Sequence, residues 1–386
     1  MSEPLHHALL PVGVPDVLPP DAGHEADLVG RLMTGFADHG YQRVKPPLLE
    51  FEESLLAGTG VALAHQTFRV MDPLSGRMMG IRPDITPQVA RIATTRLGHV
   101  ARPLRLAYAG QVLRVHGSQL RPERQVGQVG VELIGAGRPE ADAEVILLAT
   151  DSLAALGVLD LSVDLCVPTL VPTLCQAWGL DPVLTARLRQ ALDRKDAAGV
   201  AAVGGEPALV LGRLMAAAGL AAGALAVLEA TALPTAAEPD RRHLAEVVRL
   251  IGAAAPDLML TADLVEYRGF EYQTGVSFTV FSRGIGSELG VGGRYLAGAA
   301  LGAEGEPATG FTLYTDTVAT AATPSPARPR VYLPHGSDPA AGRRLRAEGR
   351  VTVAGLAPAV GVDAEARRLG CDFILADGAV RPVGKG

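Results

Sequence analysis

Two polar residues with the chemistry of a small-molecule site, Gln128 and Glu132, lie four positions apart in the segment VGQVGVEL. Apolar residues alternate with them, so in a β-strand the amide and the carboxylate share one face, with only Gly130 between them. A glycine inside a strand often marks a close approach of a ligand to the backbone. The pattern predicts a binding surface formed by Gln128 and Glu132. The alternative is the solvent-exposed face of an antiparallel sheet.

The elements that position these residues lie in the stretch from Leu104 to Ile134. Its first part, Leu104 to Val115, is rich in Leu, Val and Tyr and has no proline, which is typical of a strand. Its middle, residues 116–124, contains Gly117 and Pro122 and therefore predicts a loop. The alternating part that follows predicts the second strand of the pair.

Composition limits the class of protein. The chain has 386 residues, 48% hydrophobic and 20% charged, which is enough for two or three globular domains. The net charge of −6 argues against a broad nucleic-acid-binding surface. Three cysteines without a Cys-x-x-Cys spacing favour buried thiols in a reducing cytoplasm, with no disulfide framework and no metal site.

Targeting segments are not expected. The N-terminus is interrupted by prolines and has no basic start followed by an apolar core, so it does not resemble a signal peptide. The longest apolar run, Leu214 to Leu228, is too short to span a bilayer. We therefore expect a cytoplasmic protein without a membrane partner.

The N-terminal third is expected to mix helices and strands. A helix is predicted from Asp21, as its cap, to about His39, followed by a short strand over 41–45 and a hairpin over 66–82. In the segment PDITPQVARIATTR, Thr86 suits a helix cap and Pro87 the first turn. The apolar stripe of the first helix contains Leu28, Leu32, Met33 and Phe36.

The remaining chain predicts further layers. We expect a helix over 139–156, a strand over 159–165, an Ala-rich helical insertion over 169–256 and a strand over 270–281. The segment ELGVGGRY lacks the residues of a phosphate-binding loop, so a tight glycine turn between sheet elements is the favoured interpretation.

A Pro- and Ala-rich linker over 319–329 precedes the tail of the chain. The tail alternates short strand and helix patterns, with strands expected at RVYLP, VTVA and the end of EARRLGCDFILA. That alternation predicts a small α/β module over 330–386.

Several motifs in this order resemble one family. PVGVPDVLP, GYQRVKPPLLE, MGIRPDITPQVAR, AGQVLRVHG with VGQVGVELIG, YRGFEYQTGVSF and LGVGGRY are similar to segments of histidyl-tRNA synthetase and, more closely, of its non-catalytic relatives, the regulatory subunits of ATP phosphoribosyltransferase. The resemblance covers about residues 10–320.

The resemblance implies an α+β fold of the class II aminoacyl-tRNA synthetase type. A six- or seven-stranded antiparallel sheet flanked by helices would occupy residues 1–168 and 257–320, interrupted by the helical insertion. The core would dimerise through the first motif, near Pro47.

The resemblance also implies a pocket for free L-histidine. A carboxylate there can bind the ligand ammonium and an arginine its carboxylate, while Glu132 can accept from the imidazole. Gln273 departs from the synthetases, which usually have a second aromatic there. Taken singly, the arginines could instead pair with surface carboxylates, Thr86 could be only a cap, and Asp84 could serve the helix dipole. The matching positions are Asp84, Thr86, Arg114, Gln128, Glu132, Arg268, Tyr272 and Gln273.

Two departures separate a synthetase from a regulator. The third class II motif ends in Glu-Arg, and its arginine holds ATP, whereas this chain has Asp316-Thr317. His116 replaces the acidic residue of the second motif. A threonine supplies neither a cation nor a guanidinium plane, so the resemblance implies no catalytic residues, no cofactor and no metal.

The expected function is therefore that of a non-catalytic regulatory subunit. Its partners would be a short-form ATP phosphoribosyltransferase catalytic subunit, a second copy of itself and L-histidine, with no nucleic acid. The alternatives are a histidyl-tRNA synthetase or a divergent amino-acid ligase.

Overall fold

The computed structural model describes residues 10–117, 121–266, 273–299 and 305–384, which form two compact units. The first unit ends at Thr323 and the second begins at Pro324. Within the described residues, no helix combines the length and the apolar character that a bilayer crossing requires.

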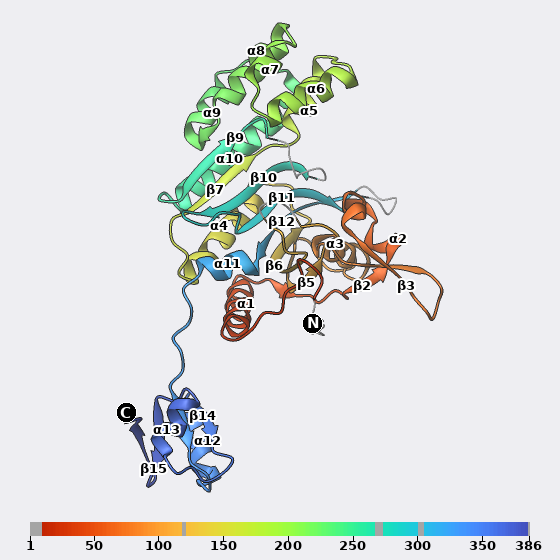
Figure 1. The fold of residues 1–386 in the computed structure, drawn as a ribbon. Coiled ribbons are helices and arrows are strands. Elements are labelled where there is room, and N and C mark those ends of the chain that lie inside the picture. The colour runs from red at the N-terminus through yellow and green to blue at the C-terminus, as the bar shows by residue number, and fades with distance from the viewer. Residues whose placement is uncertain (1–9, 118–120, 267–272, 300–304, 385–386) are drawn as a thin grey trace, which may run out of the picture. The chain divides into compact units, whose positions relative to one another are not determined.

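A nine-stranded sheet organises the first unit (Figure 1). Its six central strands are antiparallel, while the short strand β1 adds in parallel at one end and β9 adds in parallel at the other. The expectation of six or seven strands was therefore too low, because short edge strands extend the antiparallel core. In order across the sheet the strands are β1 (Gln42–Arg43), β5 (Leu104–Leu113), β6 (Gln125–Ile134), β12 (Glu306–Tyr314), β11 (Gly290–Ala297), β10 (Gln273–Ser282), β7 (Leu161–Cys166), β9 (Met259–Asp263) and β8 (Gly219–Leu220).

The predicted strand pair is confirmed as β5 and β6, with Gly110 opposite Gln128 and Leu106 opposite Glu132. The loop between the two strands falls where Gly117 and Pro122 predicted it. The face that carries the polar residues is buried, however: Gln128 is 0% exposed and Glu132 is 1% exposed. The solvent-exposed interpretation of this face is therefore wrong.

The glycine-rich segment is a strand, and the expected tight turn is wrong. Residues of β11 pair with β10 on one side and with β12 on the other. A Cβ at Gly292 would lie 2.3 Å from the Phe278 ring, so glycine is required there by packing. Sheet neighbours from distant parts of the chain satisfy the backbone and override the turn preference of the glycines.

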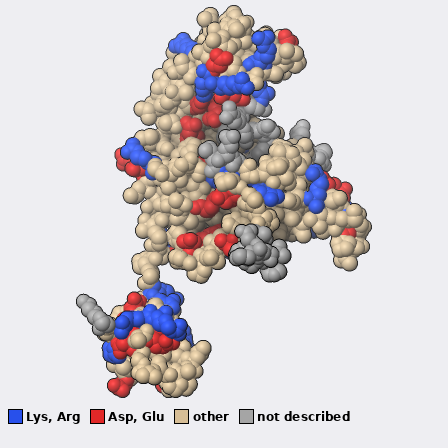
Figure 2. All heavy atoms as spheres, in the orientation of Figure 1, with Lys and Arg blue, Asp and Glu red and all other residues tan. Residues whose placement is uncertain are grey.

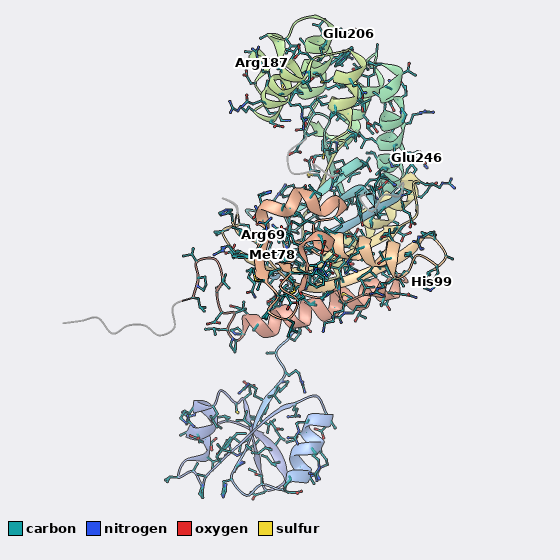
Figure 3. All side chains as sticks on the ribbon, turned by 90° about the vertical axis from the view of Figure 1, so that its right-hand side faces the viewer. Arg69, Met78, His99, Arg187, Glu206 and Glu246 are labelled. Atoms are coloured by element: carbon teal, nitrogen blue, oxygen red, sulfur yellow. The ribbon has the colours of Figure 1, made fainter. Side chains whose placement is uncertain are left out.

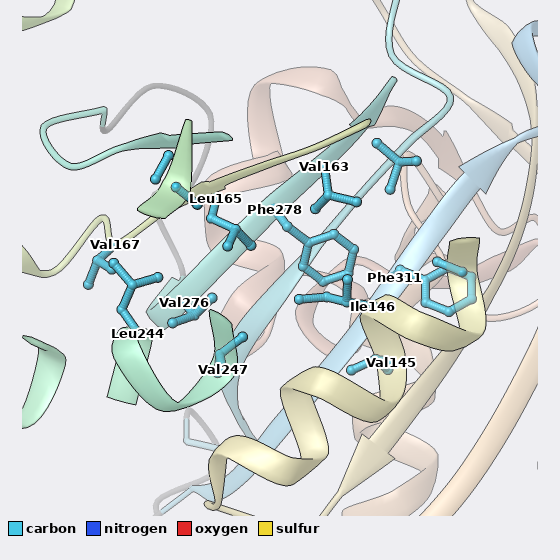
Figure 4. Packing of buried hydrophobic residues seen from close by; sticks show 14 of the residues in the cluster. Val145, Ile146, Val163, Leu165, Val167, Leu244, Val247, Val276, Phe278 and Phe311 are labelled. Carbon is cyan, nitrogen blue, oxygen red and sulfur yellow. The ribbon is translucent and has the colours of Figure 1, made fainter. Parts of the chain in front are cut away.

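Helices cover both faces of the sheet. The larger core lies between one face and helices α1 (Asp21–Asp38), α4 (Pro139–Ala155), α10 (Glu238–Ala254) and α11 (Thr315–Ala321). Figure 4 shows Ile146 of α4 beside the ring of Phe278, which projects from the sheet. Burial of each such side chain contributes about 1.5–3 kcal/mol.

The predicted stripe of α1 is largely confirmed: Leu28, Leu32 and Phe36 are buried and Met33 is half-buried. Pro20 occupies the cap position expected for Asp21, which is the first residue of the helix. Gly40, with φ +82°, follows the end of the helix.

The opposite face is covered by α3 (Thr86–Thr95), whose buried residues pack against Tyr108, Val126 and Tyr295. Beside α3 lies a small three-stranded sheet, which contains the predicted hairpin. Its strands are β2 (Leu49–Phe51), β4 (Met78–Ile81) and β3 (Phe68–Met71), with helix α2 (Glu52–Leu55) and 3-10 helix η1 (Gly58–Gln66) between β2 and β3.

The region 169–256 is helical apart from β8 and joins the main core through buried leucines such as Leu188 and Leu244. Figure 3 shows Arg187 and Glu206 at this helical end and Arg69 and Met78 on the β3–β4 hairpin. Its status as an inserted domain stays a prediction. The further elements are α5 (Leu170–Ala177), α6 (Pro182–Asp193), α7 (Ala197–Ala201), α8 (Gly205–Ala216), α9 (Ala221–Glu229) and η2 (Thr235–Ala237).

The second unit alternates short strands and helices, while its status as a separate module stays a prediction. Its linker begins later than residue 319, because α11 continues to Ala321. The last strand, β16, was missed because its four residues have no apolar alternation. The elements are β13 (Arg330–Leu333), α12 (Pro339–Ala347), β14 (Val351–Ala354), α13 (Val362–Arg368), β15 (Phe373–Ala376) and β16 (Ala379–Pro382), in the sheet order β14-β13-β15-β16.

Candidate ligand-binding site

A small cleft of about 30 Å³ lies on the α3 face of the large sheet. Strands β11 and β12 form its floor, with Glu132 of β6 on one side and Gln273 of β10 on the other. Its lining residues are Asp84, Thr86, Glu132, Gln273, Val291, Gly292, Gly293, Tyr295, Gly310, Phe311 and Thr312.

Two paired glycines keep the floor of the cleft open. Glu132 pairs with Gly310, and Gly310 pairs with Gly293 on the next strand. A Cβ at Gly310 would lie 2.1 Å from Glu132 Oε2, and one at Gly293 would lie 2.9 Å from Gln273 Oε1. Both polar side chains therefore extend over glycine backbone, where any larger residue would displace them.

Hydroxyl groups surround the Glu132 carboxyl. The Thr86 hydroxyl donates to Oε1 over 2.8 Å, and the Tyr295 hydroxyl donates to Oε2 over 2.9 Å. The Tyr108 hydroxyl is 3.4 Å from Oε1 and 2.6 Å from Thr312 Oγ1. Thr86 is the first residue of α3 rather than its cap, so the interpretation of Thr86 as only a cap is wrong.

Burial raises the pKa of Glu132 to about 8, and the nearby carboxylate of Asp84 adds to the effect. The hydrogen bonds from Thr86, Tyr295 and Tyr108 oppose it, because they stabilise the ionised form. At neutral pH the carboxyl of the free protein is therefore mostly protonated. A cation or an N–H donor entering the cleft would favour its ionised form.

Gln128 is used to hold Asp84. Its Oε1 accepts the Ile85 backbone N–H over 3.0 Å, and its Nε2 donates to Asp84 Oδ2 over 2.9 Å. The other Asp84 oxygen accepts the Thr86 backbone N–H over 2.9 Å, at the start of α3. Asp84 thus accepts a hydrogen bond at the start of α3 and also lines the cleft. Gln128 contacts Asp84 and is not among the lining residues of the cleft, so direct ligand contact by Gln128 stays a prediction.

Arg114 approaches the same carboxylate. Its Nη2 is 3.9 Å from Asp84 Oδ2, and its Nε donates to the Pro83 carbonyl over 3.2 Å. Gln273 donates from Nε2 to the Gly292 carbonyl over 3.4 Å, while its Oε1 is buried without a hydrogen-bond partner in the described structure. The predicted site residues Arg268 and Tyr272 lie outside the described residues.

Arg121 lies beside Thr317, although no sequence motif indicated Arg121 as a residue of functional interest. Its guanidinium stacks 3.6 Å from the centre of the Tyr314 ring and donates to Thr317 Oγ1 over 2.8 Å. The Glu288 and Asp316 carboxylates lie 3.6 and 3.5 Å from it. A cation is thus present beside the third motif, but it is 5% exposed and already paired. No local pattern marks Arg121, because its partners lie more than 160 residues away.

A larger hollow, of about 410 Å³, lies between α1 and α11. Figure 2 shows acidic side chains over these two helices, and Asp21, Glu25 and Asp316 line the hollow. Glu25 already accepts a hydrogen bond from the Thr315 hydroxyl over 2.7 Å. The smaller cleft has the better-defined chemistry, because a buried carboxyl and an unpaired amide oxygen converge in it.

Metal-binding groups are not gathered in the described part of the chain, where no three His, Cys, Asp or Glu side chains are placed to hold an ion. The thiols of Cys166, Cys175 and Cys371 are free and buried. Burial raises the pKa of each thiol, which disfavours the reactive thiolate.

Comparison with known proteins relates this architecture to characterised families. A family described as histidyl-tRNA synthetase matches residues 13–318. The ATP phosphoribosyltransferase regulatory subunit of Rhodospirillum centenum is 61% identical, over 97% of this chain and 96% of that protein. The ATP phosphoribosyltransferase regulatory subunit of Paramagnetospirillum magneticum is 56% identical, over 98% of this chain and 99% of that protein.

A solved structure supports the same relationship. The ATP phosphoribosyltransferase regulatory subunit/histidyl-tRNA synthetase from Bacillus halodurans C superposes with a TM-score of 0.81 at 26% identity, covering 95% of this chain and 97% of that one. The class II synthetase-like α+β fold expected from the motifs is confirmed.

Proposed function

Because the chain belongs to the family of ATP phosphoribosyltransferase regulatory subunits, we propose that it activates a short catalytic subunit and takes part in feedback by L-histidine. The catalytic partner would transfer the phosphoribosyl group, as a glycosyltransferase, in the first step of histidine biosynthesis. This chain would supply regulation without chemistry of its own.

One observation supports the proposal: polar side chains converge on one cleft, while the chain's own side chains fill the surroundings of the third motif. Glu132, Thr86 and Asp84 converge on one small cleft. Arg121 is bonded to Thr317 and flanked by two carboxylates, which disfavour a nucleotide phosphate by repulsion. A protein with this arrangement can bind an amino acid without activating it.

Histidine recognition in the cleft would underlie the feedback role. Asp84 suits the ligand ammonium and Arg114 its carboxylate by charge-assisted hydrogen bonds, and Glu132 suits the imidazole ring. Glu132→Ala should weaken histidine binding about tenfold to a hundredfold, since a hydrogen bond to a charged group is worth about 1.5–3 kcal/mol. Calorimetry of the full chain measures this. Glu206→Ala on the exposed helical end (Figure 3) is the matched control and should leave affinity unchanged. If Glu132→Ala and Glu206→Ala bound histidine with equal affinity, the placement of the imidazole ring beside Glu132 would be contradicted.

The working unit would be a hetero-oligomer in which this chain also pairs with a second copy through residues 40–50. A ligand shifts an equilibrium only by its differential affinity for the two states, so regulation requires a partner. The coupling free energy between histidine binding and the active state of the catalytic subunit should be about 1–3 kcal/mol. It should be reciprocal: a substrate that favours the active state weakens histidine binding, and histidine weakens the binding of that substrate by the same factor.

The test mixes the chain with the short catalytic subunit. Light scattering after size exclusion should show a joint complex, and phosphoribosyl-ATP formation should rise on mixing and become sensitive to histidine. Separate elution at micromolar concentration, with an unchanged rate and histidine response, would refute the proposal.

A histidyl-tRNA synthetase is the second candidate, favoured by the polar side chains that converge on the cleft. It requires an aminoacyl-adenylate, which histidine-dependent exchange of pyrophosphate into ATP reports. We expect no exchange above a protein-free blank in the presence of Mg²⁺. Robust exchange would establish the ligase instead.

A further inference from the structure

The sheet of the second unit has one edge that nothing in its own sequence protects. Its four strands have the order β14-β13-β15-β16, so β14 and β16 are the two edges. An edge strand presents unpaired N–H and C=O groups to other chains, and natural proteins usually protect it with charges or proline. Strand β16 contains Arg381 and Pro382, whereas β14 has the sequence VTVA, with neither a charge nor a proline. Strand β14 is therefore the open edge of this sheet.

The backbone of β14 shows which groups point outward. The Val351 amide donates to the Pro329 carbonyl over 2.9 Å, on the β13 side. The Gly355 amide donates to the Leu333 carbonyl over 2.7 Å, on the same side. Because backbone groups alternate in direction along a strand, the N–H and C=O of Thr352 point away from β13. In the described structure β14 pairs with β13 alone, so these two groups of Thr352 have no strand partner.

A second copy of β14 fits this edge about a two-fold axis. In an antiparallel pair, two residues directly opposite each other can exchange both backbone hydrogen bonds. When Thr352 lies opposite Thr352 of the second copy, its outward N–H and C=O meet the same two groups of that copy. Val351 then lies opposite Val353 of the second copy, and both side chains point to one face. The register is self-complementary, as a two-fold contact between identical chains requires.

Exposed apolar side chains lie beside the same edge. The loop 355–361, which follows β14, has the sequence GLAPAVG, in which Leu356 is 94% exposed and Val360 is fully exposed. The loop borders a hollow of about 690 Å³ between β14 and α13. Val353 also lines this hollow and packs on the α13 side of the sheet. Adjoining apolar residues that are left exposed mark an interaction surface.

The charges around the hollow favour a second copy as the occupant. Glu365 and Arg368 line the hollow and form an ion pair within one chain. Helix α13 has acidic residues in its first turn and basic residues in its last turn. The two-fold axis sets two copies of α13 antiparallel on one face of the joined sheet, so the acidic end of each helix lies toward the basic end of the other. Complementary charges of this kind fix the partner and the register.

The opposite face of the edge opposes the contact. Arg346 of α12 donates to the Thr352 hydroxyl over 2.7 Å, and its equivalent in the second copy would approach it across the axis. Like charges directly opposite each other on paired strands are destabilising. This repulsion limits the strength of the pairing, so covalent capture detects the contact better than elution volume does.

We propose that the second unit is an assembly module, in which β14 pairs with β14 of a second copy and joins two four-stranded sheets into one of eight strands (Figure 1). Pairing over four residues supplies only a few hydrogen bonds, and the exposed loop 355–361 provides the further buried surface that a specific contact needs. This inference depends neither on histidine binding nor on a catalytic subunit.

Cross-linking of the full chain tests the register. Thr352→Cys places one accessible thiol on the axis, because the native thiols of Cys166, Cys175 and Cys371 are buried. A short bismaleimide should then join two chains into a covalent dimer. Ala379→Cys, at an exposed position of the opposite edge strand β16, is the matched control and should remain a single chain. Equal cross-linking of the two variants, or none with Thr352→Cys, would overturn the inference.

Two second changes, each combined with Thr352→Cys, separate edge pairing from random collision. Ala354→Pro removes an outward N–H and keeps the bonds to β13, since proline is tolerated on an edge strand where its N–H would face solvent. Leu356→Glu places like charges in the exposed loop, where no packing is lost. Each should lower the rate of covalent dimer formation about tenfold. An unchanged rate in both would refute the pairing. Loss of the dimer when the short catalytic subunit is added would assign the edge to that protein instead.

Discussion

Replacing Glu132 by glutamine should stabilise the free protein increasingly as the pH rises. The amide has nearly the same shape and can still form hydrogen bonds with the surrounding hydroxyls, but it does not ionise. The pKa of the native carboxyl is raised in the fold from 4.5 to about 8, chiefly by burial. The fold therefore favours the protonated form, and this contribution is complete below about pH 4.5, decreases as the pH rises and is lost above about pH 8.

The magnitude follows from that displacement. Each unit of pKa difference between the folded and unfolded states corresponds to about 1.4 kcal/mol. The change from 4.5 to about 8 thus sets an upper value of about 5 kcal/mol. Between pH 5.5 and pH 8.5, the free energy of unfolding of the variant should gain about 3 kcal/mol relative to the native chain.

Urea unfolding of the full chain, followed at several pH values from 5.5 to 8.5, measures this difference. Glu206→Gln, at an exposed helix position, is the matched control, and its difference from the native chain should stay nearly constant. A difference for Glu132→Gln that is flat with pH, or that decreases as the pH rises, would refute the conclusion that burial dominates at this carboxyl.

Three further substitutions probe the cleft and its supports. Gly310→Ala would place a methyl group 2.1 Å from Glu132 Oε2, so histidine binding in calorimetry should be lost; native affinity would contradict the glycine floor. Arg121→Met should lower the free energy of unfolding by about 1–3 kcal/mol, because two carboxylates lose their cation, and should not create ATP–pyrophosphate exchange. Asp142→Asn should destabilise by about 3–5 kcal/mol in urea, because the buried Arg294, which donates to Asp142 over 2.6 Å, would lose its counter-charge; a change below 1 kcal/mol would argue against this pairing.

Local periodicity was enough to predict the elements that carry the cleft. The alternation around Gln128 and Glu132 correctly placed both on one face of a strand, because side chains of a strand alternate regardless of its surroundings. The helix that begins near Thr86 and the stripe of α1 were readable for the same reason, since helical spacing is a property of a few consecutive residues.

Only the tertiary structure decided what those residues contact. Glu132 meets Tyr295, 163 positions away, and Arg121 meets Thr317, 196 positions away. The glycine-rich segment formed a strand because β10 and β12 offer it hydrogen bonds on both sides. Sequence spacing determines which side chains share a face. Burial, pKa and hydrogen-bond partners depend on elements that meet only when the sheet assembles, and these distant contacts bury the Glu132 carboxyl beside a cleft and raise its pKa.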